Sequence, residues 1–135
     1  MSEQAARRPL GDAQTRAANR TWWDAEAEDY YAEHGGFLGD DDFCWGPEGL
    51  RESEAQLLGP LSGRDVLEIG AGAAQCSRWV RDQGARVVAT DLSLRMLLRG
   101  VAIDAARPDP QGIPVVQCDG RQLPFPDESF DAVFT

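Results

Sequence analysis

Residues 66–75, with the sequence Val-Leu-Glu-Ile-Gly-Ala-Gly-Ala-Ala-Gln, constrain the fold of this chain more than any other segment. The apolar residues around one acid predict a buried parallel strand, and the two glycines predict a turn where a ligand can approach the backbone. A helix is expected from Ala74 to about Gln83, with its free N–H groups directed at that turn. A strand, a glycine turn and a helix in this order bind anionic or nucleotide-like groups. The segment therefore predicts part of a nucleotide-type cofactor site.

Strand and helix patterns alternate from residue 61 to the end of the chain. Apolar runs predict strands at 65–69, 86–90, 113–118 and 130–135, and Ser93 is expected to cap a helix at 94–105. Repeated strand–helix–strand units imply a parallel sheet with right-handed crossovers. The predicted fold class is α/β.

The first 60 residues follow a different pattern. Residues 1–14 have little apolar content and are expected to be disordered, whereas residues 15–60 are expected to form an N-terminal helical cap. Within this cap the patterns predict one helix at 15–34, ended by Gly35-Gly36, and a second at 48–58.

Composition excludes several classes of function. A net charge of −10 argues against a general nucleic-acid binder and against a surface that binds anionic lipid. All 13 basic residues are arginine, which excludes a pyridoxal-phosphate Schiff base and a Walker-type phosphate loop, because both need lysine. The three widely spaced cysteines predict reduced thiols, with neither a zinc site nor a disulfide framework. The sequence shows no secretory leader and no apolar run of membrane-spanning length, so we expect a cytoplasmic protein.

Four motifs stand in order along the second half of the chain. They are Glu68-x-Gly70-x-Gly72, Asp91 after the second strand, Asp119-Gly120 after the third, and residues 123–131 before the fourth. In these motifs the chain from about Val66 to Thr135 resembles the class I S-adenosylmethionine-dependent methyltransferases, and the small-molecule methyltransferases among them in particular. The resemblance implies a Rossmann-like sheet with strand order 3-2-1-4, truncated relative to the seven strands of the family. It also implies S-adenosyl-L-methionine as cofactor and a small-molecule methyl acceptor.

The resemblance gives each motif residue a role. Gly70 and Gly72 would let the backbone approach the methionine part and the ribose of the cofactor, and Glu68 would act near its ammonium group. Asp91 would hydrogen-bond the ribose hydroxyls, because two acceptor oxygens match a vicinal diol. Asp119 would accept from the adenine amine. The complete expected cofactor-binding set is Glu68, Gly70, Ala71, Gly72, Gln75, Asp91, Leu92, Met96, Asp119 and Gly120.

The resemblance also implies that the N-terminal helices fold over the cofactor. Trp22, Tyr30 and Trp45 are the lid candidates, although aromatic residues at such positions are more often core residues. No residue stands in the context of a catalytic base, and no pattern indicates a metal site.

Other interpretations remain open. An NAD-type dinucleotide site would need a third glycine where Gln75 stands, and it would give Asp119 no role. The alternative from another class of function is a non-catalytic module that binds the cofactor or serves as a scaffold. The apolar strand at 130–134 carries no lysine or proline to protect its edge. We therefore expect either the N-terminal part of a longer methyltransferase or a small protein that buries this strand against another chain, and self-association through the strand when the chain is isolated.

Overall fold

The computed structural model describes residues 11–38, 42–108 and 110–135, and the side chains of residues 28–38 lie outside the description. Two helices precede the sheet: a long α1 (Asp12–Leu38) and a short α2 (Glu52–Ala55). Strands and helices then alternate, and the chain ends on two strands with a long connection between them. These elements are β1 (Asp65–Ile69), α3 (Gln75–Asp82), β2 (Arg86–Asp91), α4 (Leu94–Ala105), β3 (Val115–Gln117) and β4 (Ala132–Phe134).

The four strands form one parallel sheet in the order β3-β2-β1-β4. The central strand β1 pairs with β2 along its whole length, from Asp65 opposite Arg86 to Ile69 opposite Thr90. The predicted α/β class and the predicted strand order are confirmed. Because all four strands are parallel, their carboxyl ends lie along one edge of the sheet.

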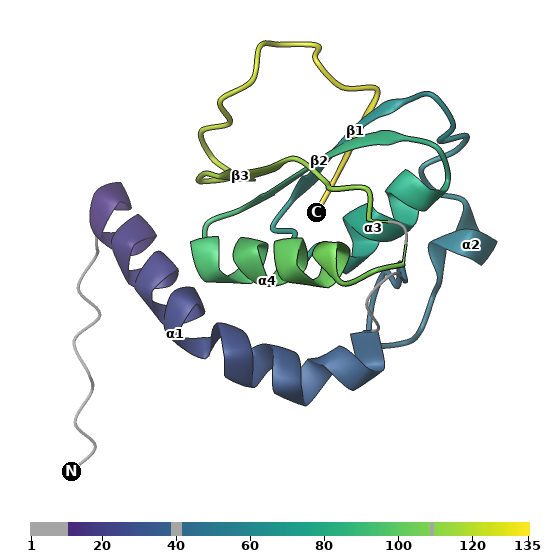
Figure 1. Cartoon of the computed structure of the whole chain (residues 1–135). Helices are drawn as coiled ribbons and strands as arrows, with labels where there is room; N and C mark the ends of the chain where they lie inside the picture. Colours follow the sequence, from purple (N-terminus) through teal and green to yellow (C-terminus); the bar gives the residue numbers. More distant parts are fainter. Residues whose placement is uncertain (1–10, 39–41, 109) are drawn as a thin grey trace.

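Helices α3 and α4 cover one face of the sheet, and α1 crosses on the outer side of α4 (Figure 1). The core between sheet and helices contains Val66, Val87 and Ala89 from the strands and Val80 from α3. The connection between β3 and β4 arches away on the other side of the sheet. Helix α1 also lies across the carboxyl ends of the strands, although it is remote from them in the sequence.

An aromatic cluster joins the segment after α1 to the last strand. The ring of Phe43 lies 4.7 Å from that of Trp45, 4.8 Å from that of Phe134 and 6.0 Å from that of Trp79. Phe43 is buried, so the cluster closes the core next to β4.

The helix predicted at 48–58 is wrong in extent, because only Glu52–Ala55 is helical. Gly49 has a φ of +82° and Gln56 a φ of +51°, so the backbone leaves the helical region on both sides. The Glu52 carboxylate is buried and accepts hydrogen bonds from the Trp45 indole and the Leu58 N–H. These contacts fold the segment around Glu52 instead of extending the helix.

The other differences lie at the ends of elements. Helix α1 begins at Asp12, inside the segment predicted to be disordered, and continues through Gly35-Gly36 to Leu38. Residues 1–10 lie outside the described part of the chain. Strands β3 and β4 are shorter than predicted, whereas α4 has the predicted bounds, and its cap Ser93 accepts from the N–H of Met96 over 3.3 Å. Among the described residues, no helix is both long and apolar enough to cross a membrane.

Candidate functional site

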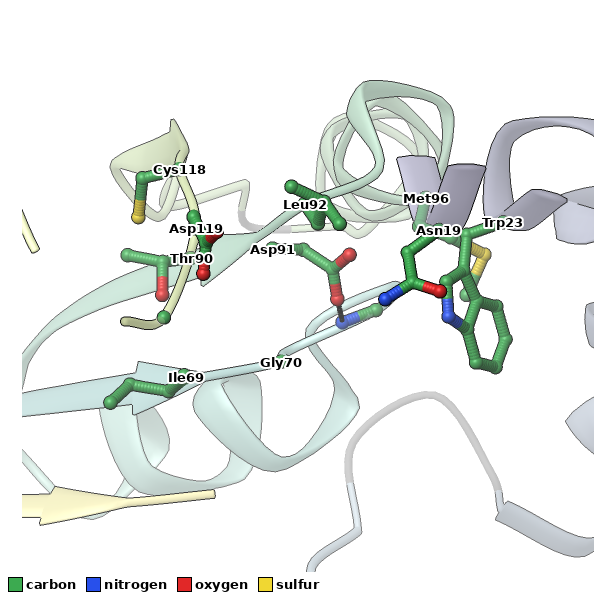
Figure 2. Close-up of a pocket in the computed structure, with 12 residues that line it drawn as sticks. Asn19, Trp23, Ile69, Gly70, Thr90, Asp91, Leu92, Met96, Cys118 and Asp119 are labelled. Carbon is green, nitrogen blue, oxygen red and sulfur yellow. Dashed lines mark hydrogen bonds between the residues drawn. The ribbon is translucent and has the colours of Figure 1, made fainter. Parts of the chain in front are cut away.

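A cavity of about 300 Å³ opens at the carboxyl ends of β1, β2 and β3 (Figure 2). Open α/β sheets bind their ligands outside this edge. The lining comes from α1, from the ends of the three strands and from the first part of α4. It consists of Asn19, Trp23, Ile69, Gly70, Gly72, Thr90, Asp91, Leu92, Met96, Cys118, Asp119 and Gly120.

The turn after β1 forms the floor of this cavity. Gly70 and Gly72 have φ angles of +71° and +59°, which glycine adopts without steric cost. A Cβ at Gly72 would lie 3.2 Å from Cε of Met96, so this position is also crowded. The N–H of Ala71 donates to the Thr90 carbonyl over 2.8 Å, which ties the turn to β2. Both glycines are therefore needed for the conformation of the turn.

Asp91 ends β2 beside this turn. Its Oδ2 accepts from the N–H of Gly72 and its Oδ1 from the N–H of Ser93, each over 2.8 Å. Figure 2 shows the first of these bonds. A carboxylate oxygen has two lone-pair sites, so each oxygen keeps one for a ligand in the cavity. Asp91 can thus hold the glycine turn and Ser93, the cap of α4, and still accept from two neighbouring hydroxyls.

Asp119 follows β3 and is held by two arginines. Its oxygens accept from the N–H and the guanidinium of Arg121 and from Nε of Arg16, with the shortest contact to each donor 2.9 Å. These bonds, those of Arg121 first, hold the pKa of Asp119 well below its usual range. The carboxylate therefore stays ionised, and a ligand that donates to it shares it with Arg16 and Arg121.

Three residues of the expected set lie outside the cavity lining. Glu68 is only 6% exposed and points to α3, where its Oε1 accepts from Oγ of Ser77 over 2.7 Å and from the N–H of Ser77 over 3.2 Å. Burial raises the pKa of Glu68 to about 7, although the bonds from Ser77 act in the opposite direction. Ala71 is buried in the core, and Gln75 is half-buried at the start of α3. The other seven expected residues line the cavity.

Helix α1 supplies two lining residues that sequence reasoning missed, Asn19 and Trp23. They lie beside Asp91 and Met96 in Figure 2. Together with Arg16 they follow the spacing i, i+3, i+7, which places all three on one face of the helix.

Two residues of α1 fasten this face of the helix over the cavity. Arg16 donates to Asp119, and directly after Trp23 the carboxylate of Asp24 accepts from the Ser93 hydroxyl and from the N–H of Arg95. Spacing alone could have indicated the shared face. The contacts that turn it toward the cavity join residues far apart in the sequence.

The structure describes the side chains of two of the three lid candidates, Trp22 and Trp45. Trp22 is 54% exposed, and Trp45 packs on Phe43 and Phe134, so both lie outside the cavity lining. The tryptophan that does line it, Trp23, meets Trp22 edge to face at a centroid distance of 4.7 Å. The side chain of Tyr30 lies outside the described residues.

The cavity lining also contains one cysteine. Cys118 lines it, whereas Cys76 is partly buried against the core, and this burial raises the pKa of the Cys76 thiol to about 12. All three cysteines are free thiols. In the described ranges, no group of three or more His, Cys, Asp or Glu side chains is arranged to hold a metal ion.

Comparisons with known proteins point to one family. A family profile described as "Methyltransferase domain" matches residues 67–135. The demethylmenaquinone methyltransferase of Thermobifida fusca is 37% identical over 83 residues, which are 62% of this chain and 35% of that protein. The chain thus spans about a third of the length of this curated relative.

Two solved structures are similar to the fold. An S-adenosylmethionine-dependent methyltransferase from Mesorhizobium loti matches with a TM-score of 0.52 and 34% identity, over 65% of this chain and 40% of that one. Phosphoethanolamine N-methyltransferase 1 of Haemonchus contortus matches with a TM-score of 0.66 over 92% of this chain and 26% of that one. At 22% identity the second match supports the fold alone.

Proposed function

The chain belongs to the class I methyltransferase domain family, and from that membership we propose that it binds S-adenosylmethionine in the cavity above β1–β3. We further propose that the methyl group passes from there to a small-molecule acceptor. Seven of the ten residues that the family resemblance assigns to this cofactor line the cavity, and they converge from three separate segments of the chain.

The observation that carries the proposal is the position of the Asp91 carboxylate. It stands between the glycine turn and Asp119, and each of its oxygens accepts one backbone N–H and keeps one free lone-pair site. This arrangement suits the two neighbouring hydroxyls of a ribose. Leu92 and Met96 offer an apolar wall for a flat base, and Asp119 offers an acceptor for its amine.

When bound, the cofactor supplies an electrophilic methyl group on a sulfonium sulfur. The residues of this chain bind and orient it: the glycine turn admits it close to the backbone, and the carboxyl groups of Asp91 and Asp119 favour a cationic ligand over an anionic one. Fixing donor and acceptor in line accounts for most of the rate enhancement expected of such a site.

The acceptor is proposed only as a class. The names of the relatives denote methylation of demethylmenaquinone, a small molecule, which supports a small-molecule acceptor here. The similarity to those proteins covers about a third of their length. The family profile matches residues 67–135, which contain the cofactor motifs.

Isothermal calorimetry with S-adenosylhomocysteine tests the proposal. We expect binding by the wild-type chain, a large loss in Asp91→Ala, and unchanged binding in the control Asp127→Ala, which alters an exposed carboxylate outside the cavity. Tighter binding of NAD than of S-adenosylhomocysteine would overturn the assignment and favour a dinucleotide site.

A further inference from the structure

The side chain of Arg78 is completely buried between the glycine turn and α4, with 0% exposure. Its Nε donates to Oδ1 of Asp104 over 2.8 Å. Its Nη2 donates to the carbonyl of Ala73 over 2.9 Å and to that of Gly100 over 3.2 Å. One guanidinium thus joins the back of the glycine turn to two points of α4, the helix that runs beside α3 in Figure 1.

The turn that Arg78 contacts has an uncommon backbone conformation. Gly70, Gly72 and Ala74 all have positive φ, and the value for Ala74 is +64°. The left-handed region is free for glycine but costs energy for an L-residue such as alanine. A residue in this region persists only where the surrounding structure holds it there. Ala74 directly follows the carbonyl that Arg78 binds.

Gly100 closes the space behind the same carbonyl. A Cβ at Gly100 would lie 2.7 Å from the Ala73 oxygen and 2.9 Å from its carbonyl carbon, so the backbone of α4 touches the turn. The Ala73 carbonyl is therefore held from two directions. On the other side of the turn, Gly70 and Gly72 line the cavity, so a movement of Ala73 would move the cavity floor.

We propose that Arg78 is a positioning residue for the cofactor site. Its guanidinium holds the Ala73 carbonyl and thereby keeps the glycine turn, with Ala74 in the left-handed conformation, in the shape that accepts the cofactor. Asp104 neutralises and orients the guanidinium from α4. This inference rests on the proposed function, because it concerns the floor of the same cavity.

The test compares affinity with stability in a variant that removes both buried charges, Arg78→Met combined with Asp104→Leu. Replacing a buried ion pair with apolar residues leaves neither of the two charges unpaired and is often neutral for stability. Arg81, which also contacts Asp104, keeps its hydrogen bonds to Asp82 and Gln111 in this variant. We expect a melting temperature close to that of the wild type and a dissociation constant for S-adenosylhomocysteine raised by about tenfold or more, because a charge-assisted hydrogen bond to the turn is lost.

Arg81→Met is the matched control. Arg81 stands on the same helix and contacts the same Asp104 over 3.2 Å, but its other hydrogen bonds go to Asp82 and Gln111. We expect wild-type affinity in this variant. An equal loss of affinity in Arg81→Met would overturn the inference, since the effect would then come from α3 in general.

Ala74→Gly distinguishes an action of Arg78 through the turn from a general contribution of Arg78 to the fold. Glycine adopts the left-handed conformation without cost, so this change should restore part of the affinity in the Arg78→Met, Asp104→Leu background. No restoration would overturn the proposed action through the turn.

Arg78→Lys covers the case in which the double variant does not fold. Lysine keeps the charge beside Asp104 but lacks the planar fork that serves Asp104 and two carbonyls together, so weaker binding is expected. If the double variant folds and binds with wild-type affinity, the inference is overturned. If it does not fold, wild-type affinity in Arg78→Lys overturns the inference. In both cases the proposed function stands. Failure of the wild-type chain itself to bind S-adenosylhomocysteine would overturn both.

Discussion

The backbone N–H of Gly72 donates to Oδ2 of Asp91 over 2.8 Å, so the turn after β1 and the end of β2 share one hydrogen bond at the cavity wall. The second oxygen of the same carboxylate accepts from Ser93 at the start of α4. Three structural elements therefore meet at one side chain, which is also the main candidate for ligand contact.

Replacing Asp91 with asparagine should lower stability as well as affinity. An amide has one acceptor oxygen in place of two, so either the Gly72 or the Ser93 N–H faces an NH₂ group. We expect the free energy of unfolding to fall by about 1–3 kcal/mol, the usual cost of an unsatisfied donor. Urea denaturation checks this, with Asp127→Asn as the exposed control. An unchanged midpoint in Asp91→Asn would show that these bonds contribute nothing to the fold.

Glu68 should make stability depend on pH near neutrality. Burial raises its pKa from 4.5 to about 7 in the folded chain, so the folded state holds a proton that the unfolded state releases. The stabilisation is complete below pH 4.5 and is lost as the pH rises through 7, by about 3 kcal/mol in total for a shift of this size.

Glu68→Gln isolates this effect, because glutamine can still accept from Ser77 and does not titrate. Unfolding free energies of both proteins measured between about pH 5 and pH 8 should diverge, with the wild type losing stability relative to the variant as the pH rises. Parallel curves would rule out a raised pKa at Glu68.

Gly100→Ala should destabilise the chain although it lies within a helix. Alanine normally favours a helix over glycine, but here the new Cβ would lie 2.7 Å from the Ala73 oxygen and would force the turn and α4 apart. We expect a loss of about 1–3 kcal/mol by thermal or urea unfolding, as for other overpacked sites. Gly112→Ala is the control, because nothing lies within 4 Å of the position that its new methyl group would take.

Trp23→Ala should weaken binding of S-adenosylhomocysteine more than Trp22→Ala does. The two residues are adjacent and their rings touch, but only Trp23 lines the cavity, while Trp22 is 54% exposed. The two variants have the same composition, so calorimetry compares the loss of one indole with the loss of the other. Equal losses of affinity would mean that binding depends on helix α1 in general and not on the indole of Trp23.

The alternating half of the fold was predictable because its signals are local. The apolar runs of β1 and β2, the glycines between β1 and α3, and the Ser93 cap of α4 each act over a few residues. The seven predicted residues that line the cavity belong to this half. Their position at the ends of adjacent parallel strands follows from the topology.

The features that the sequence did not predict depend on contacts between residues far apart in the chain. The bonds between Asp24 and Ser93 and between Arg16 and Asp119 fix which face of α1 is turned toward the cavity. For this reason Trp23 lines the cavity and Trp22 does not. Likewise, bonds from Trp45 and Leu58 bury Glu52 at the start of the short helix α2, although the sequence around it is typical of a longer helix. The role of Glu68 near the ammonium group of the cofactor stays a prediction, and the hydroxyl of Ser77 on the next helix donates to its carboxylate.

The contact between Phe43 and Phe134 has a consequence for how the chain acquires its structure during synthesis. The two rings are 4.8 Å apart, yet 90 intervening residues separate them in the sequence. A growing chain cannot close this part of its core until Phe134 has left the ribosome, and closing so long a loop is slow. Until then Phe43 and Trp45 remain available to chaperones or to other nascent chains.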